Sequence, residues 1–93
     1  MIRRLFRVTG RVQGVGFRWF TLKAARARKL RGYVRNLSDG SVEVVVEGPG
    51  TEVGQLRAEI TRGPVASSVH GVEETELSVE DGSGLGTGFD VRH

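Results

Sequence analysis

A tight turn in the middle of the chain restricts the possible folds more than any other feature. The turn is Ser38-Asp39-Gly40-Ser41, and Asp-Gly tolerates the positive φ that hairpin turns need. Residues 33–37 before it predict one strand. The segment after it alternates as a second strand does, with Val42, Val44 and Val46 on one face and Glu43, Val45 and Glu47 on the other. The sequence therefore predicts an antiparallel hairpin here.

The segment before this hairpin changes from strand periodicity to helix periodicity. Residues 5–9 alternate as in a half-buried strand, and a glycine-rich turn ends the alternation. Apolar side chains then recur at helical spacing, at Phe17, Phe20, Ala24, Ala27 and Leu30. We expect this helix to stop at Gly32, with Lys29 and Arg31 placed favourably near the negative end of its dipole.

A second helix is predicted after the hairpin. Gly48-Pro49-Gly50 breaks the strand, Thr51 is placed to cap the helix, and Gly63-Pro64 is expected to stop it. Its apolar stripe consists of Val53, Leu56 and Ile60. This helix therefore also has one face to bury.

The last part of the chain predicts two strands separated by a loop. The first covers Val65–Leu77, with a β-bulge near Gly71 because the apolar residues there fall out of alternation. The loop, residues 78–88, is rich in glycine. Phe89 and Val91 alternate with polar residues in a short final strand.

The order strand, helix, strand, strand, helix, strand is that of the ferredoxin-like βαββαβ sandwich. This is an α+β fold with an antiparallel sheet and two helices on one face. Residues 1–93 contain neither an internal repeat nor a linker, so we expect a single domain. Because the fold supports many functions, the function has to be predicted from a site.

Composition narrows the possible kinds of site. Cysteine is absent, which excludes disulfides, a thiolate nucleophile and a thiolate metal site, and which fits a reducing cytoplasm. The basic N-terminus is not followed by the apolar run of a signal peptide or a membrane span. The net charge of +3 and the pI near 10.2 suit an anionic partner, either a small phosphate compound or a nucleic acid. A solvated basic surface explains them equally well.

The glycine-rich turn is the strongest candidate site, with the sequence Gly10-Arg11-Val12-Gln13-Gly14-Val15-Gly16-Phe17-Arg18. A turn that enters a helix N-terminus presents unpaired backbone N–H groups to an anion, and glycine allows close approach. Arg18 opposes the helix dipole unless an anion lies between them, and its guanidinium can bind two phosphate oxygens. The alternative is that Arg18 is exposed and its stem covers a neighbouring side chain.

Asn36, late in the strand before the Asp39-Gly40 turn, is a second candidate. Its amide both donates and accepts hydrogen bonds, so it can hold a water molecule. Local reasoning favours a structural role instead, in which Asn36 is satisfied by the backbone beside the turn. The distance from Asn36 to the glycine-rich turn stays open at this point.

Other kinds of site fit the sequence poorly. A Walker A loop needs Gly-Lys-Ser/Thr, and a dinucleotide fingerprint needs glycine at the position of Trp19. The two histidines, His70 and His93, suit neither a zinc site nor a nucleophile-elbow triad. An RNA-binding module shares the predicted fold, but after Arg31-Gly32-Tyr33 the RNA-recognition signature is lost. A regulatory module without turnover is a further alternative.

The two candidate segments together resemble acylphosphatases. Residues 8–18 (V-T-G-R-V-Q-G-V-G-F-R) are similar to the family signature V-x-G-x-V-Q-G-V-G-F-R, and residues 32–44 to G-x-V-x-N-x-x-D-G-x-V. Gly63-Pro64 and residues 88–91 are similar to later landmarks, so the resemblance covers nearly the whole chain. Tyr33 stands where the family often has Trp, a change expected to affect packing.

The resemblance implies hydrolysis of the carboxyl–phosphate bond of acyl phosphates. It implies that Arg18 binds the phosphoryl group and that Asn36 orients the attacking water, which reverses the local interpretation of Asn36. The phosphate cradle would consist of the backbone amides of Gln13, Gly14, Val15, Gly16 and Phe17.

This chemistry also limits the partners that we expect. A carboxylate leaves without protonation, and phosphoryl transfer needs mostly positioning and charge stabilisation, so neither a metal nor a cofactor is expected. We expect a cytoplasmic monomer that acts on a small acyl phosphate and releases inorganic phosphate, without a nucleic acid or membrane partner. The sequence does not select among acyl groups.

Overall fold

The computed structural model describes residues 1–79 and 85–92, which form five strands and two helices. They are β1 (Ile2–Arg11), α1 (Phe17–Ala27), β2 (Arg31–Asn36), β3 (Val42–Gly48), α2 (Gly50–Arg62), β4 (Ser68–Leu77) and β5 (Phe89–Arg92). The predicted loop over residues 78–88 lies partly outside the described residues, at positions 80–84.

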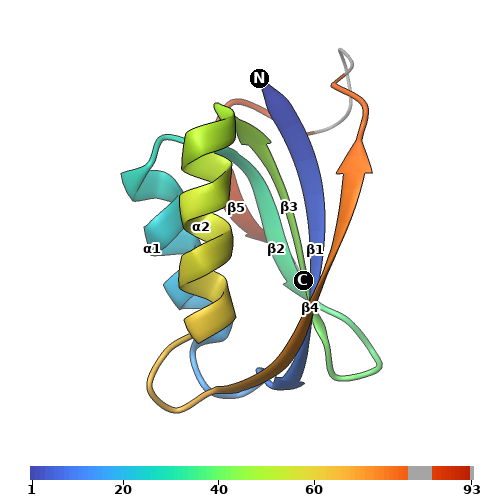
Figure 1. Ribbon diagram of the computed structural model, residues 1–93. Helices are drawn as coiled ribbons and strands as arrows, with labels where there is room; N and C mark the ends of the chain where they lie inside the picture. The colour runs from blue at the N-terminus through green and yellow to red at the C-terminus, as the bar shows by residue number, and fades with distance from the viewer. Residues whose placement is uncertain (80–84, 93) are drawn as a thin grey trace.

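The sheet has the strand order β4-β1-β3-β2-β5, and both helices cover the same face of it (Figure 1). The first four strands pair antiparallel, as expected for the ferredoxin-like sandwich, so the predicted fold is confirmed. β5 pairs with β2 in parallel, which makes the sheet mixed rather than purely antiparallel. β4 and β5 lie at opposite edges of the sheet, so β5 is not the hairpin partner of β4 and pairs with β2 instead.

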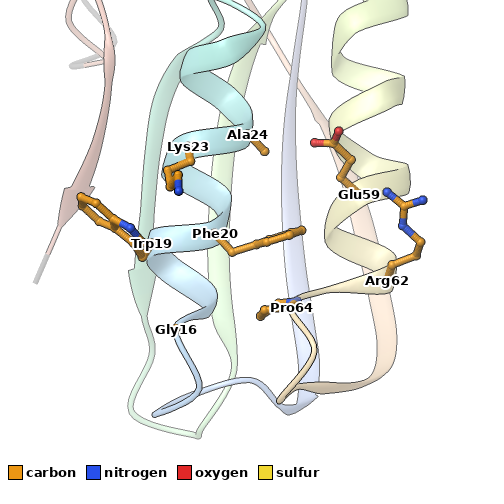
Figure 2. Close-up of a pocket in the computed structure, with 8 residues that line it drawn as sticks. All are labelled: Gly16, Trp19, Phe20, Lys23, Ala24, Glu59, Arg62 and Pro64. Carbon is orange, nitrogen blue, oxygen red and sulfur yellow. The ribbon is translucent and has the colours of Figure 1, made fainter.

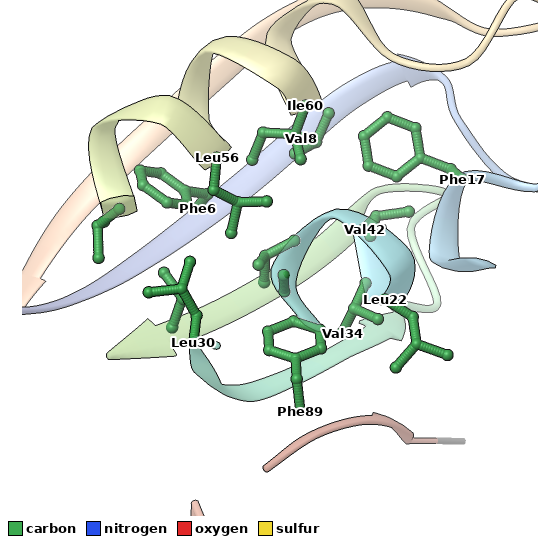
Figure 3. Close-up of a cluster of buried hydrophobic side chains, with 14 of the residues drawn as sticks. Phe6, Val8, Phe17, Leu22, Leu30, Val34, Val42, Leu56, Ile60 and Phe89 are labelled. Atoms are coloured by element: carbon green, nitrogen blue, oxygen red, sulfur yellow. The ribbon is translucent and has the colours of Figure 1, made fainter. Parts of the chain in front are cut away.

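The core lies between the sheet and the two helices (Figure 3). The alternating face of β3 that was predicted to be apolar is fully buried, together with Phe6 and Val8 of β1. The stripe of α2 is buried against them, as predicted, and consists of Val53, Leu56 and Ile60. Apolar burial of about 25 cal/mol per Å² makes this packing the main stabilising contribution to the fold.

The hairpin between β2 and β3 forms where the Asp-Gly turn predicts it. Asn36 lies opposite Val42, and the Leu37 N–H donates to the Ser41 carbonyl at 2.9 Å. Gly40 takes a φ of 94°, the left-handed conformation for which glycine was expected. The β-bulge near Gly71 is also confirmed, because Thr9 lies opposite Gly71 and the register then shifts.

The end of α1 differs from the prediction. The helix ends at Ala27, where Lys29 adopts a left-handed φ of 56° and Leu30 N–H donates back to the Ala25 carbonyl. This turn places Leu30 in the core. Gly32 lies within β2 instead of stopping the helix, and a Cβ there would approach the Val45 carbonyl oxygen to 1.9 Å.

The start of α2 also differs. The helix begins at Gly50 with Pro49 as the residue before it, and no side chain caps its N-terminus. The predicted capping role of Thr51 is therefore wrong, because Thr51 already lies inside the first turn. Proline before the helix fixes a compatible φ, here −59°, without a capping hydrogen bond.

Candidate active site

The glycine-rich loop connects β1 to α1 at the lower end of the sheet in Figure 1. Gly14 and Gly16 have φ values of 75° and 80°, in the region that favours glycine. A Cβ at either position would meet no atom within 4 Å, so the space beside both residues is open. Val15 packs partly buried against the core and anchors the loop between them.

The N-terminus of α1 is left without compensation by the chain itself. Its N-cap residue is Gly16, no side chain makes a capping hydrogen bond, and no acidic residue lies in the first turn. The first backbone N–H groups of a helix have no acceptor within the helix, and the dipole adds about half a positive charge there. Such an end is suited to binding an anion.

A pocket of about 210 Å³ opens in front of this helix end. It brings the two candidate catalytic residues, Arg18 and Asn36, onto one surface although β2 and α1 are separate elements. The full lining consists of Val12, Gly14, Gly16, Phe17, Arg18, Trp19, Asn36 and Val91. Of the predicted site residues, only Gln13 and Val15 do not line it.

Asn36 is the last residue of β2, and its side chain lines the pocket. Its Oδ1 is buried and accepts no hydrogen bond from any residue that the structure describes. A buried oxygen without a donor costs about 1–3 kcal/mol, so it is expected to accept a hydrogen bond from water or a ligand. This contradicts the local interpretation, in which the backbone beside the turn satisfies Asn36.

The side chain of Gln13 has a contact that sequence reasoning missed. Its Nε2 donates to the carbonyl oxygens of Leu37, at 2.8 Å, and Ser41, at 2.9 Å. Gln13 thereby ties the glycine-rich loop to the hairpin that follows Asn36. No local signal indicates this bridge, because both acceptors are backbone atoms 24 and 28 residues away.

The turn that Gln13 contacts is itself held in place. The Ser41 N–H and hydroxyl both donate to Asp39 Oδ1, and Arg7 donates to the other oxygen. The Ser41 hydroxyl and then the Arg7 guanidinium hold the pKa of Asp39 well below its ordinary value. Asp39 is therefore ionised at neutral pH, and the turn keeps its hydrogen bonds.

The remaining candidate groups lie elsewhere. His70 is exposed on β4 and does not line the pocket. Within residues 1–79 and 85–92, no three His, Cys, Asp or Glu residues are grouped as metal ligands would be. The two described helices are too short and too polar to cross a membrane.

Comparison with known proteins places these features in a family. The acylphosphatase family model matches residues 5–91. An acylphosphatase of Pasteurella multocida is 50% identical over 78 residues, which cover 84% of this chain and 87% of that protein. An acylphosphatase of Syntrophotalea carbinolica is 48% identical over 91 residues, which cover 98% and 96%. The crystal structure of an acylphosphatase from Bacillus subtilis superposes with a TM-score of 0.92 at 35% identity, covering both chains completely. The chain therefore belongs to the acylphosphatase family.

Proposed function

We propose that this protein hydrolyses the carboxyl–phosphate bond of acyl phosphates, with Arg18 and the glycine-rich loop binding the phosphoryl group and Asn36 orienting the attacking water. The observation that carries the proposal is the pocket itself. It joins Arg18, an uncapped helix N-terminus and the unsatisfied Oδ1 of Asn36 on one surface.

The phosphoryl group is held by two kinds of donor. The backbone amides of the loop surround its oxygens, namely those of Gln13, Gly14, Val15, Gly16 and Phe17. Arg18 adds a planar guanidinium that can bind two oxygens at once. Both contributions strengthen as negative charge accumulates on the equatorial oxygens in the transition state.

The water is held by Asn36. Its Oδ1 accepts one hydrogen bond from the water and directs an oxygen lone pair at phosphorus, opposite the carboxylate. A bond forms between the water oxygen and phosphorus while the bond from phosphorus to the carboxylate oxygen breaks. The electron pair leaves with the carboxylate, and the water proton passes to a phosphate oxygen. These steps use no side-chain base and no cofactor.

The open face of the sheet supports this function over RNA binding. The face opposite the helices carries arginines that are already paired, Arg35 with Glu43 at 2.6 Å and Arg31 with Glu47 at 2.7 Å. Its tyrosine, Tyr33, lies 4.0 Å from the Arg92 guanidinium. RNA-binding sheets need aromatic rings free to stack on bases.

We further expect the enzyme to act as a cytoplasmic monomer.

Hydrolysis of benzoyl phosphate in the presence of EDTA tests the proposal. We expect turnover that inorganic phosphate inhibits competitively. Absence of turnover, or activity only with added metal, would contradict it. RNA binding at physiological salt that survives Arg18→Ala would favour the alternative function.

A further inference from the structure

A second concavity adjoins the proposed site, between α1 and α2, with a volume of about 530 Å³ (Figure 2). We propose that this groove binds the acyl group of the substrate and selects acyl phosphates with an apolar body and an anionic far end. The inference rests on the proposed function, since it names the substrate class for the same site.

The groove is continuous with the phosphate pocket. Gly16 and Trp19 line both of them. The side chain of Trp19 is 62% exposed, although tryptophan side chains are mostly buried in folded proteins. An acyl group bonded to a phosphoryl group at the N-terminus of α1 therefore has a direct path along this helix into the groove.

The middle of the groove is apolar. Phe20 points from α1 toward α2, with Pro64 beside it, while Trp19 points to the other side of α1 (Figure 2). The Phe20 ring is tilted against the buried Phe17 ring, with centroids 6.2 Å apart, so its position is fixed by the core. Ala24 adds no bulk one turn further along. This surface fits a flat aromatic or short aliphatic acyl group.

Two cations line the groove on opposite sides, Lys23 on α1 and Arg62 on α2 (Figure 2). Neither Lys23 nor Arg62 forms an ion pair with any residue that the structure describes. The one carboxylate in the lining, Glu59, already binds Arg28 at 2.7 Å. Lys23 lies about two helical turns, roughly 11 Å, beyond Gly16 along the α1 axis. A substituted benzoyl group and the long side chain of Lys23 can together span this distance. An anionic substituent at the far end of the acyl group would be attracted by the positive charge of both side chains.

Three substrates that differ only in the acyl group test the acyl subsite independently of the phosphate site. They are acetyl phosphate, benzoyl phosphate and 4-carboxybenzoyl phosphate. We expect kcat/KM to rise in that order. The Lys23→Gln/Arg62→Gln variant should lower the preference for the carboxylated over the plain benzoyl substrate about fivefold, because exposed ion pairs are individually weak. The control, Lys29→Gln/Arg57→Gln, removes the same charge outside the groove and should leave the preference unchanged.

Binding without turnover gives an independent readout. Trp19 is the only tryptophan, so its fluorescence reports ligands at the junction of the two concavities. 4-Carboxybenzoylphosphonate should bind more tightly than benzoylphosphonate, and the difference should shrink at high salt. Turnover with no preference for the carboxylated compound, in wild type and variant alike, would overturn the inference while leaving the proposed function intact. Preferential binding without any turnover would support the subsite and contradict the proposed function.

Discussion

The N-termini of the two helices both lack a side-chain cap, but they differ in the charge of their first turns. Each follows a strand of the same sheet, and neither has a capping side chain. α2 carries Glu52 in its first turn, where a carboxylate balances the helix dipole. α1 carries no acidic residue there, and its second residue is Arg18.

This difference separates a helix end that the chain balances itself from the helix end that we propose as the phosphate-binding site. Glu52 supplies α2 with its own negative charge and also approaches Arg28 at 3.4 Å. The N-terminus of α1 combines the dipole, the open backbone at Gly16 and a cation that repels the dipole. We expect a bound anion to reduce this repulsion, because its negative charge attracts both the helix end and the guanidinium. Substitutions at five positions test whether this contrast decides function, from the largest expected effect to the smallest.

Arg18→Ala should have the largest effect. Loss of the guanidinium that stabilises transition-state charge is expected to lower kcat/KM about 10³-fold and to weaken inhibition by phosphate. Steady-state hydrolysis of benzoyl phosphate measures both quantities. Arg18→Lys keeps the charge but loses the planar fork, so it should recover only part of the activity. Full activity in the lysine variant would show that charge alone matters.

Asn36→Ala should lower kcat about 100-fold, a loss similar to that on removing one preorganised hydrogen-bonding group. Inhibition by phosphate should be nearly unchanged, because Asn36 is proposed to hold the water. Asn36→Asp places a negative charge beside the phosphoryl site and should weaken phosphate inhibition as well. Equal loss of turnover and phosphate inhibition in Asn36→Ala would argue against the water-orienting role.

Gln13→Ala should lower kcat about tenfold, because the loop and the hairpin after Asn36 would lose both bridging hydrogen bonds. The backbone amide at this position remains, so KM and phosphate inhibition should change little. Gln13→Glu keeps the shape but cannot donate to the two carbonyls, and it should be at least as impaired. An unimpaired Gln13→Glu variant would exclude a positioning role for the bridge.

Trp19→Glu gives α1 a carboxylate at the position that Glu52 occupies in α2. Compared with Trp19→Gln, which removes the same indole, it should raise the inhibition constant for phosphate about fivefold, because the new charge repels the anion and neutralises the dipole. Thermal unfolding should show the Glu variant slightly more stable without phosphate. Equal inhibition constants for the two variants would mean that the charge in the first turn of α1 does not affect phosphate binding.

Glu52→Gln should have the smallest effect. Hydrolysis should be unchanged, while the free energy of unfolding in urea should fall by about 0.5 kcal/mol, since a surface helix loses its dipole partner and a weak ion pair. A marked loss of activity in this variant would contradict the separation of the two helix ends.

Most of the fold follows from local patterns in the sequence. The Asp39-Gly40 turn and the alternating valines predict the hairpin, and the stripe of α2 predicts which of its faces is buried. The end of α1 was mispredicted because Lys29, a residue rarely left-handed, makes the turn that glycine usually makes. Gly32 is needed for its close approach to Val45, a contact between neighbouring strands that sequence cannot display.

The candidate site also follows in part from local sequence patterns. The glycine-rich loop and Arg18 form a local signal, since they are contiguous and their chemistry depends on the helix that follows. Asn36 lies near this loop because of how β2 is placed beside α1. From the local sequence alone, Asn36 is expected to be a structural residue beside the turn. The Gln13 bridge and the second groove depend wholly on packing between distant segments, and no sequence pattern indicates them.

The central claim is that the N-terminus of α1, and not that of α2, binds the phosphoryl group together with Arg18. Titration of the ¹⁵N-labelled protein with inorganic phosphate, followed by amide chemical shifts, tests it directly. We predict saturable shifts confined to residues 13–18 and Asn36, with none at residues 50–52, and loss of these shifts in Arg18→Ala. Equal shifts at both helix ends, or shifts that persist in Arg18→Ala, would contradict the claim.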